Sequence, residues 1–171
     1  METTDNQYEV FDVVDLDDKV IGEATRGQTH NNKNLIHRSV GIAVFNRRGK
    51  IFLQRRSMTK DTDALLWTIS CSGHVLKGEN YQETAYRELT EELGIEGSVL
   101  NFLIKYIFYG EKETEMVTLY KINYDGEIAL QTEEILEGKF FSKQEISSAI
   151  ATSDIELNLW GKTALAKLGI I

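Results

Sequence analysis

The chain has 171 residues, of which 42% are apolar and 27% charged, as in an ordinary globular protein with its own core. The formal net charge of −8 argues against nonspecific binding to a nucleic acid polymer or to an anionic membrane. The only cysteine, Cys71, excludes an intrachain disulfide and indicates a reducing, cytoplasmic compartment; the polar segment 1–7 lacks the apolar core of a signal peptide. No apolar run is as long as a membrane span.

The predicted elements alternate between strands and helices, and no repeat, low-complexity tract or linker interrupts them. Because the chain has no proline, its turns depend on Gly, Asn and Asp. In chain order we expect a hairpin at 8–25, a polar loop at 27–34, a hairpin at 37–57, a strand at 64–73, a helix at 80–93, two strands at 98–124, a strand at 134–141, a helix at 142–150 and an apolar periodic segment at 155–171. This order predicts one α/β domain covering 1–171.

The clearest helix carries a crowded set of carboxylates. Asn80 is its expected N-cap, Glu83 stands where a capping box needs it, and Gly94 is its stop signal. An apolar stripe runs along one face through Tyr81, Ala85, Leu89 and Leu93.

Glu88, Glu91 and Glu92 lie on an arc beside this stripe, where they are partly desolvated and close together. That arrangement is costly unless a cation neutralises it, and oxygen ligands at this density suit Mg²⁺ or Mn²⁺. The alternative interpretation is a solvated acidic face, the usual role of a charge run.

The full spacing of the segment resembles the Nudix box at every defined position. Gly73 is followed by five residues, Glu79, seven residues and then the run from Arg87 to Ile95, "RELTEELGI". The resemblance implies a Nudix α/β/α sandwich with a mixed sheet and one catalytic loop–helix motif. It also implies Mg²⁺-dependent cleavage of a diphosphate attached to another group.

The Nudix resemblance assigns roles to individual residues. Glu88 and Glu92 are the main metal ligands that it implies, with the Gly73 carbonyl and Glu91 near the ions. Arg87 and Glu79 fix the geometry between loop and helix. A carboxylate must take a proton from the attacking water, and Glu91 and Glu88 are both candidates.

A second set of metal-binding residue types lies elsewhere in the chain. The three histidines are His30, His37 and His74, and the last two lie at the ends of predicted strands. Glu113 and Glu115 alternate, so they point to the same face of a strand. Three imidazoles and two carboxylates match the donors of a Mn²⁺ or Zn²⁺ site. Spacing alone does not bring them together, and separate structural or exposed histidines are the alternative.

The stretches "LIHRSVGIAVFNRRGKIFLQRRSMTK" and "LWTISCSGH" resemble type 1 isopentenyl-diphosphate isomerase, a branch of the Nudix superfamily, with similarity over about 8–120. The resemblance implies a divalent ion held by the three histidines, Glu113 and Glu115, and a Mg²⁺ ion at Glu92. It further implies that Arg26, Arg56 and Lys60 bind the diphosphate and that Tyr109 lies beside the substrate alkene. Trp160 is a core aromatic or a residue of the substrate cleft.

One departure from the isomerase pattern changes the predicted reaction. Ser72 stands where the isomerase has its catalytic cysteine, and a hydroxyl is far less acidic than a thiol. Cys71 is adjacent, but neighbouring side chains in a strand point to opposite faces, so we expect it in the core unless a bulge intervenes. We therefore predict a Mg²⁺-dependent (or Mn²⁺-dependent) Nudix hydrolase that cleaves a phosphoanhydride in a small-molecule, nucleoside diphosphate-type or related substrate. The alternatives are a type 1 isopentenyl-diphosphate isomerase and a noncatalytic diphosphate-binding module.

Overall fold

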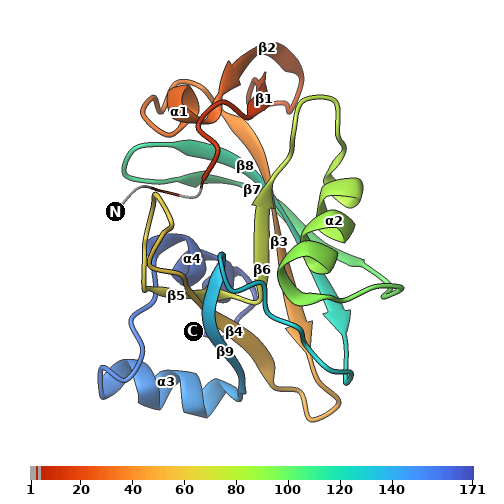
Figure 1. Ribbon diagram of the computed structural model, residues 1–171, viewed down its shortest axis with the longest axis vertical. Helices are drawn as coiled ribbons and strands as arrows, with labels where there is room; N and C mark the ends of the chain where they lie inside the picture. Colours follow the sequence, from red (N-terminus) through yellow and green to blue (C-terminus); the bar gives the residue numbers. More distant parts are fainter. Residues whose placement is uncertain (1–2, 4) are drawn as a thin grey trace.

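The computed structural model describes residue 3 and residues 5–171, which form nine strands and four helices (Figure 1). In chain order the elements are β1 (Val10–Val14), β2 (Val20–Thr25), α1 (Arg26–Thr29), β3 (His37–Phe45), β4 (Ile51–Arg56), β5 (Trp67–Ile69), β6 (Cys71–His74), α2 (Tyr81–Leu93), β7 (Asn101–Tyr109), β8 (Thr114–Asn123), β9 (Ile135–Phe141), α3 (Lys143–Ala151) and α4 (Leu159–Lys167).

The strands form one mixed sheet around β3. This strand pairs in parallel with β8 along its whole length, from His37 opposite Glu115 to Phe45 opposite Asn123. It pairs antiparallel with β6, while β8 pairs antiparallel with β7. The other part of the sheet places β4 between β5 and β9, both antiparallel. The N-terminal hairpin of β1 and β2 adds to the sheet through β3.

Helices cover both faces of the sheet, which makes the three layers of an α/β/α sandwich. Figure 1 shows α2 on one side of the strands and α3 and α4 on the other. Two buried apolar clusters lie in the two interfaces. One includes Val40 and Ile42 of β3 with Leu89 and Leu93 of α2. The other contains Leu119 of β8 together with residues of α3 and α4. No described helix is long and apolar enough to cross a membrane.

The predicted single strand at 64–73 is two strands in the structure. The break falls at Ser70, whose hydroxyl donates to the Phe52 carbonyl at 2.6 Å and accepts from the Val44 amide at 2.8 Å. Ser70 therefore bridges the two parts of the sheet, since β5 pairs with β4 whereas β6 pairs with β3. The polar loop at 27–34 also differs from the prediction, because the short helix α1 occupies its beginning.

Helix α2 begins and ends as its sequence predicts. The Asn80 side chain accepts from the amides of Gln82 and Glu83, and the Glu83 carboxylate accepts from the Asn80 amide at 3.1 Å. Gly94 ends the helix with a φ of 64°, a left-handed conformation that favours glycine. These caps fix the point at which the helix begins, and so fix where its glutamates lie relative to β6.

Candidate active site

A cavity of about 940 Å³ lies beside α2, β6 and the loops after α1 and β4, and we call it the central cavity. Most of the predicted site residues line it. These are Arg26, His30, Arg56, Lys60, Gly73, His74, Glu88, Glu91, Glu92, Glu113 and Glu115. His37 lies fully buried behind the lining, and Tyr109 lies outside it.

Glu88 and Glu92 are buried one helical turn apart on α2, which places two carboxylates on one edge of the cavity. They face β6 at Gly73, where a Cβ atom would lie 2.0 Å from Glu88 Oε1. Glycine is required here because any side chain would displace that carboxylate. With the exposed Glu91, these residues form what we call the glutamate site.

Arg87 connects the glutamate site to the loop before α2. Its guanidinium donates two hydrogen bonds of 3.1 Å to the two oxygens of Glu79 and one of 3.1 Å to the His74 carbonyl. It also donates to Glu88 Oε1 at 2.7 Å and to Glu91 Oε2 at 3.1 Å. A bidentate pair of this kind fixes orientation as well as distance, so Arg87 holds the helix and the preceding loop in register.

The two buried glutamates resist ionisation. Burial and the charge of Glu92 raise the pKa of Glu88 to about 8. Burial and the charge of Glu134 raise the pKa of Glu92 to about 7, although Gln54 Nε2 donates to Glu92 Oε2 at 2.8 Å and opposes the shift. Two buried carboxylates without a neutralising cation are a destabilising arrangement, and a divalent ion beside them would lower both pKa values.

Three histidines and a glutamate also converge beside the cavity. His30, His37, His74 and Glu113, which we call the histidine cluster, each offer one atom within 4.8 Å of the others. His30 Nε2 lies 3.1 Å from Glu113 Oε2 and 3.4 Å from His74 Nε2, and His37 Nε2 lies 3.8 Å from Glu113 Oε2. Two ligands on one ion at about 2.1 Å are about 3 to 3.5 Å apart, so this spacing fits a common metal.

The protonation of the histidine cluster also fits a metal site. Burial lowers the pKa of His30 to about 4 and of His37 to about 3, so both rings are neutral at pH 7. Burial and the charge of Glu115 raise the pKa of Glu113 to about 8. His37 Nε2 and Glu113 Oε2 are buried and make no hydrogen bond within the described part of the chain, as expected of atoms that have a ligand role.

Arg26 contacts His74, and this contact would have to change if His74 bound a metal. Its Nη1 lies 3.2 Å from His74 Nδ1, and because a guanidinium only donates, Nδ1 must accept. The neutral His74 ring then carries its proton on Nε2. A metal bound at Nε2 would require Arg26 to move away from His74, so that Nδ1 can hold the proton instead.

Glu115 lies next to the histidine cluster, outside the group of four. It stands opposite His37 in the β3–β8 ladder, and its Oε2 accepts from the Trp160 indole at 3.1 Å. Trp160 lines the cavity from α4, and its ring fits only because residue 41 is glycine: a Cβ there would lie 2.5 Å from the indole. Trp160 therefore belongs to the buried core cluster and also lines the cavity, so both positions considered from the sequence describe part of its surroundings.

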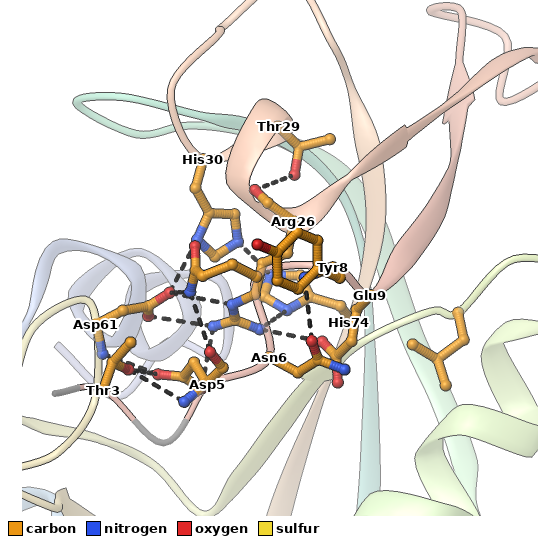
Figure 2. Close-up of polar contacts among 12 residues, drawn as sticks. Thr3, Asp5, Asn6, Tyr8, Glu9, Arg26, Thr29, His30, Asp61 and His74 are labelled. Carbon is orange, nitrogen blue, oxygen red and sulfur yellow. Dashed lines mark hydrogen bonds and ion pairs between the residues drawn. The ribbon is translucent and has the colours of Figure 1, made fainter.

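The three predicted phosphate-binding cations line the same cavity, and we call Arg26, Arg56 and Lys60 the cation site. Arg26 and Lys60 are deeply buried with carboxylate partners, and Figure 2 shows the contacts of Arg26. Arg56 donates to the Thr62 carbonyl at 3.1 Å and so supports the loop that carries Lys60.

Ser72 and Cys71 are neighbours in strand β6, and their side chains point to opposite faces of the sheet. It pairs with β3 in unbroken register, with Gly41 opposite Ser72 and Ile42 opposite Cys71, so no bulge turns the cysteine towards the cavity. Ser72 lines the cavity, whereas Cys71 is fully buried in the α2-side core. Burial, together with the charges of nearby glutamates, raises the pKa of its thiol. The expectation that Cys71 is a core residue is confirmed.

Tyr109 does not lie where the isomerase resemblance implied. It pairs with Thr114 in the β7–β8 ladder, and its side chain is 68% exposed. Phe108 pairs with Glu115, is buried and lines the cavity. Because side chains alternate along a strand, a difference of one residue moves the predicted aromatic to the outer face. Phe108 is the aromatic residue of β7 at the cavity.

The sequence did not predict several residues that line the cavity or contact its lining, among them Asp5, Gln54, Asp61, Phe108 and Glu134. Gln54 had a signal, since it is a lone polar residue at a core position of "IFLQRR". The acidic residues had none, because each reaches the cavity through long-range folding. Hydrogen bonds from Arg26 and Gln7 lower the pKa of Asp61, although burial opposes the shift.

Comparison with known proteins agrees with this geometry. A family model described as the NUDIX domain matches residues 35–160. The chain belongs to the Nudix family. It is 30% identical over 165 residues to an isopentenyl-diphosphate Delta-isomerase of Serratia proteamaculans, covering 94% of this chain and 92% of that protein. It is 38% identical over 142 residues to a Yersinia pestis protein named as an uncharacterized Nudix hydrolase, covering 82% of this chain and 76% of that protein.

The fold has close structural counterparts. The DR0079 protein of Deinococcus radiodurans matches with a TM-score of 0.78 at 22% identity, covering 91% of this chain and 96% of that chain. The predicted Nudix sandwich is therefore confirmed, as is membership of the isopentenyl-diphosphate isomerase-like branch of the Nudix superfamily.

Proposed function

We propose that the protein is a metal-dependent hydrolase that cleaves a phosphoanhydride in a nucleoside diphosphate-type or related small molecule. The observation that carries this proposal is the pair of buried carboxylates, Glu88 against Gly73 and Glu92 one turn later, in the same cavity as three cations. A metal beside the carboxylates and cations beside the phosphates together match the charges of a diphosphate ester.

The glutamate site fits Mg²⁺ or Mn²⁺ by its donors. Its side chains offer only carboxylate oxygens, and the raised pKa values of Glu88 and Glu92 are what an unneutralised hard-cation site has. The ion would neutralise phosphate charge and lower the pKa of a bound water. Glu88, Glu91 and Glu92 would hold it, with the Gly73 carbonyl nearby.

The protein's own residues supply the remaining chemistry. Arg26, Arg56 and Lys60 would hold the phosphate oxygens, Arg forks as bidentate donors and Lys as a point charge. Either Glu88 or Glu91 would accept the proton of the attacking water, and both contact Arg87, which orients them. The exposed carboxylate of Glu91 can pass a proton to solvent, whereas that of Glu88 is buried.

The histidine cluster supports a second divalent site of imidazole and carboxylate ligands, suited to Mn²⁺ or Zn²⁺. His30, His37, His74 and Glu113 would be its ligands. Glu115 could join them through its Oε1 atom while its Oε2 atom accepts from the Trp160 indole.

A second candidate function is isomerisation of isopentenyl diphosphate, favoured by the histidine cluster and by the 30% identical Serratia relative. It requires an acid and a base on the two sides of an alkene. Ser72 holds the cysteine position on the cavity side, and its hydroxyl is too weak an acid for that step. Hydrolysis does not need the cysteine, because a carboxylate serves as its base.

A product assay tests both functions. The purified protein is incubated with Mg²⁺ or Mn²⁺ and a panel of nucleoside diphosphates, dinucleotides and isopentenyl diphosphate, and phosphorus NMR follows each substrate. We expect metal-dependent release of a monophosphate from at least one member of the panel. Conversion of isopentenyl to dimethylallyl diphosphate would establish the isomerase, and binding of all diphosphates without turnover would indicate a noncatalytic module.

A further inference from the structure

The chain segment before β1 enters the cation site (Figure 2). Asp5 and Glu9 line the central cavity, although Asn6 and Tyr8 between them are exposed. The Asp5 side chain is only 5% exposed, which is unusual for a carboxylate. Its contacts are therefore a specific feature of the cavity.

The donors around Asp5 are those that phosphate oxygens require. Lys60 Nζ contacts Asp5 Oδ1, and Arg26 Nη2 lies 3.3 Å from the same oxygen. Asp5 Oδ2 accepts from the Asp61 amide at 2.8 Å. An ammonium, a guanidinium and a backbone N–H converge on one small anion, which is how proteins bind a phosphoryl group. The carboxylate of Asp5 takes the place of that phosphoryl group.

Charge makes simultaneous occupancy unfavourable. Besides Asp5, Arg26 contacts Asp61 at 3.1 Å and Glu9 at 3.6 Å, and Lys60 contacts Glu134 at 2.6 Å. The two cations are already outnumbered by carboxylates, so a phosphoryl group added beside Asp5 would meet net repulsion. Displacing Asp5 would leave Asp61, Glu9 and Glu134 in place but would free the positions at Lys60 Nζ and Arg26 Nη2, so that the ligand replaces one anion with another.

The segment is attached in a way that permits this removal. Two backbone hydrogen bonds hold its far end, from the Arg26 amide to the Glu9 carbonyl at 2.8 Å and from the Gly27 amide to the Gln7 carbonyl at 3.1 Å. On the other side of these bonds, the backbone of Asp5 belongs to no helix or strand. Besides its ion pairs, Asp5 accepts a hydrogen bond of 3.3 Å from Gln7 Nε2 at its carbonyl, so displacement exchanges polar contacts of Asp5 for polar contacts of the ligand.

We propose that Asp5 is an internal anion that occupies the phosphoryl position of the cation site and that a diphosphate ligand displaces it. The identity of the ligand rests on the proposed function. Because only the displaced form binds, the apparent dissociation constant for a diphosphate is the intrinsic one divided by the fraction of molecules in which Asp5 is displaced. Asp5 thus sets the substrate affinity of the enzyme without taking part in its chemistry.

Titration calorimetry with methylenediphosphonate and Mg²⁺ tests the displacement, because this probe binds as a diphosphate and cannot be hydrolysed. The Asp5→Asn variant removes the competing charge and retains the shape of the side chain. We expect it to bind the probe at least about fivefold more tightly than the natural chain. The matched control is Asp17→Asn, an equal charge change at an exposed residue of the β1–β2 turn, which should leave affinity unchanged. Equal or weaker binding by Asp5→Asn would refute the proposal.

Hydrogen exchange gives an independent result on the unmodified chain. Binding of the probe should accelerate exchange in the peptide covering 5–9 and leave β1 unchanged. Slower exchange at 5–9 would mean that the segment closes over the ligand, which contradicts displacement. Tighter probe binding by Asp5→Asn with no hydrolysis of any diphosphate would overturn the proposed function alone, whereas hydrolysis with unaltered probe affinity would overturn the role of Asp5 alone.

Discussion

Replacing Glu92 by glutamine should have opposite effects on stability without and with metal. Glu92 is buried, and its pKa is raised to about 7 against an ordinary value of 4.5. Between these values the folded state binds more protons than the unfolded state, so ionisation of Glu92 costs stability as the pH rises. At pH 8 the cost is on the order of 3 kcal/mol. Glutamine removes the charge and keeps an oxygen that can accept from Gln54.

In EDTA at pH 8, Glu92→Gln should therefore be as stable as the natural chain or more stable, by up to about 2 kcal/mol. Mg²⁺ at about 100 times its dissociation constant should stabilise the natural chain by about 2.7 kcal/mol. The variant lacks the ligand and should gain little, so the order of stability reverses, and turnover should be lost.

Urea unfolding of both proteins, with EDTA and with Mg²⁺, measures this reversal. The control is Glu96→Gln, the same change at an exposed residue just after α2, which should alter neither the stability order nor turnover. Unchanged Mg²⁺-dependent hydrolysis by a folded Glu92→Gln protein would refute the metal role of the glutamate site. A natural chain whose stability is indifferent to Mg²⁺ would do the same.

Three further predictions concern Gly73, Trp160 and the protonation of two buried glutamates. Gly73→Ala places a Cβ 2.0 Å from Glu88 Oε1, so it should abolish metal-dependent hydrolysis and cost about 1 to 3 kcal/mol in urea unfolding. Trp160→Phe removes the donor to buried Glu115 and should cost about 1 to 3 kcal/mol in the same assay, whereas equal stability would mean that this bond is replaced. Because the pKa values of Glu88 and Glu113 are both raised to about 8, the folded state retains protons that the unfolded state has lost. The metal-free protein should therefore lose stability from pH 6.5 to pH 8, and saturating Mg²⁺ with Mn²⁺ should reduce that slope.

The sequence predicted those parts of the site that local periodicity determines. The N-cap, the C-terminal glycine and the burial of Glu88 and Glu92 all follow from the spacing of α2, because a helix fixes its own faces. The Nudix resemblance placed the Gly73 carbonyl near the glutamates, and the structure adds that Gly73 packs directly against Glu88.

Local sequence patterns did not predict which residues of distant segments lie close together in the fold. His30 follows α1, His37 begins β3 and His74 ends β6, so their convergence depends on pairings between strands that local patterns do not specify. Resemblance supplied that expectation. It failed at Tyr109, where a shift of one residue reverses the face, and Phe108 is the residue that lines the cavity.

The position of Asp5 in the cavity could not be predicted from the sequence either. Its segment has no periodicity, and in the sequence it is one of several acidic residues in a polar N-terminus. Only the fold places it between Arg26 and Lys60. Such contacts depend on where an irregular segment meets strands and loops that are distant in the sequence, and no local pattern predicts that position.

The source of the oxygen atom in the product tests the central claim most directly. The protein is incubated with Mg²⁺ and the diphosphate panel in water enriched in oxygen-18, and mass spectrometry follows both phosphate and unreacted diphosphate. We predict one oxygen-18 atom in a released monophosphate and no product in EDTA or with Glu92→Gln. Isopentenyl diphosphate that stays intact, yet gains deuterium on carbon in a parallel incubation in D₂O, would contradict the hydrolase proposal and identify the isomerase.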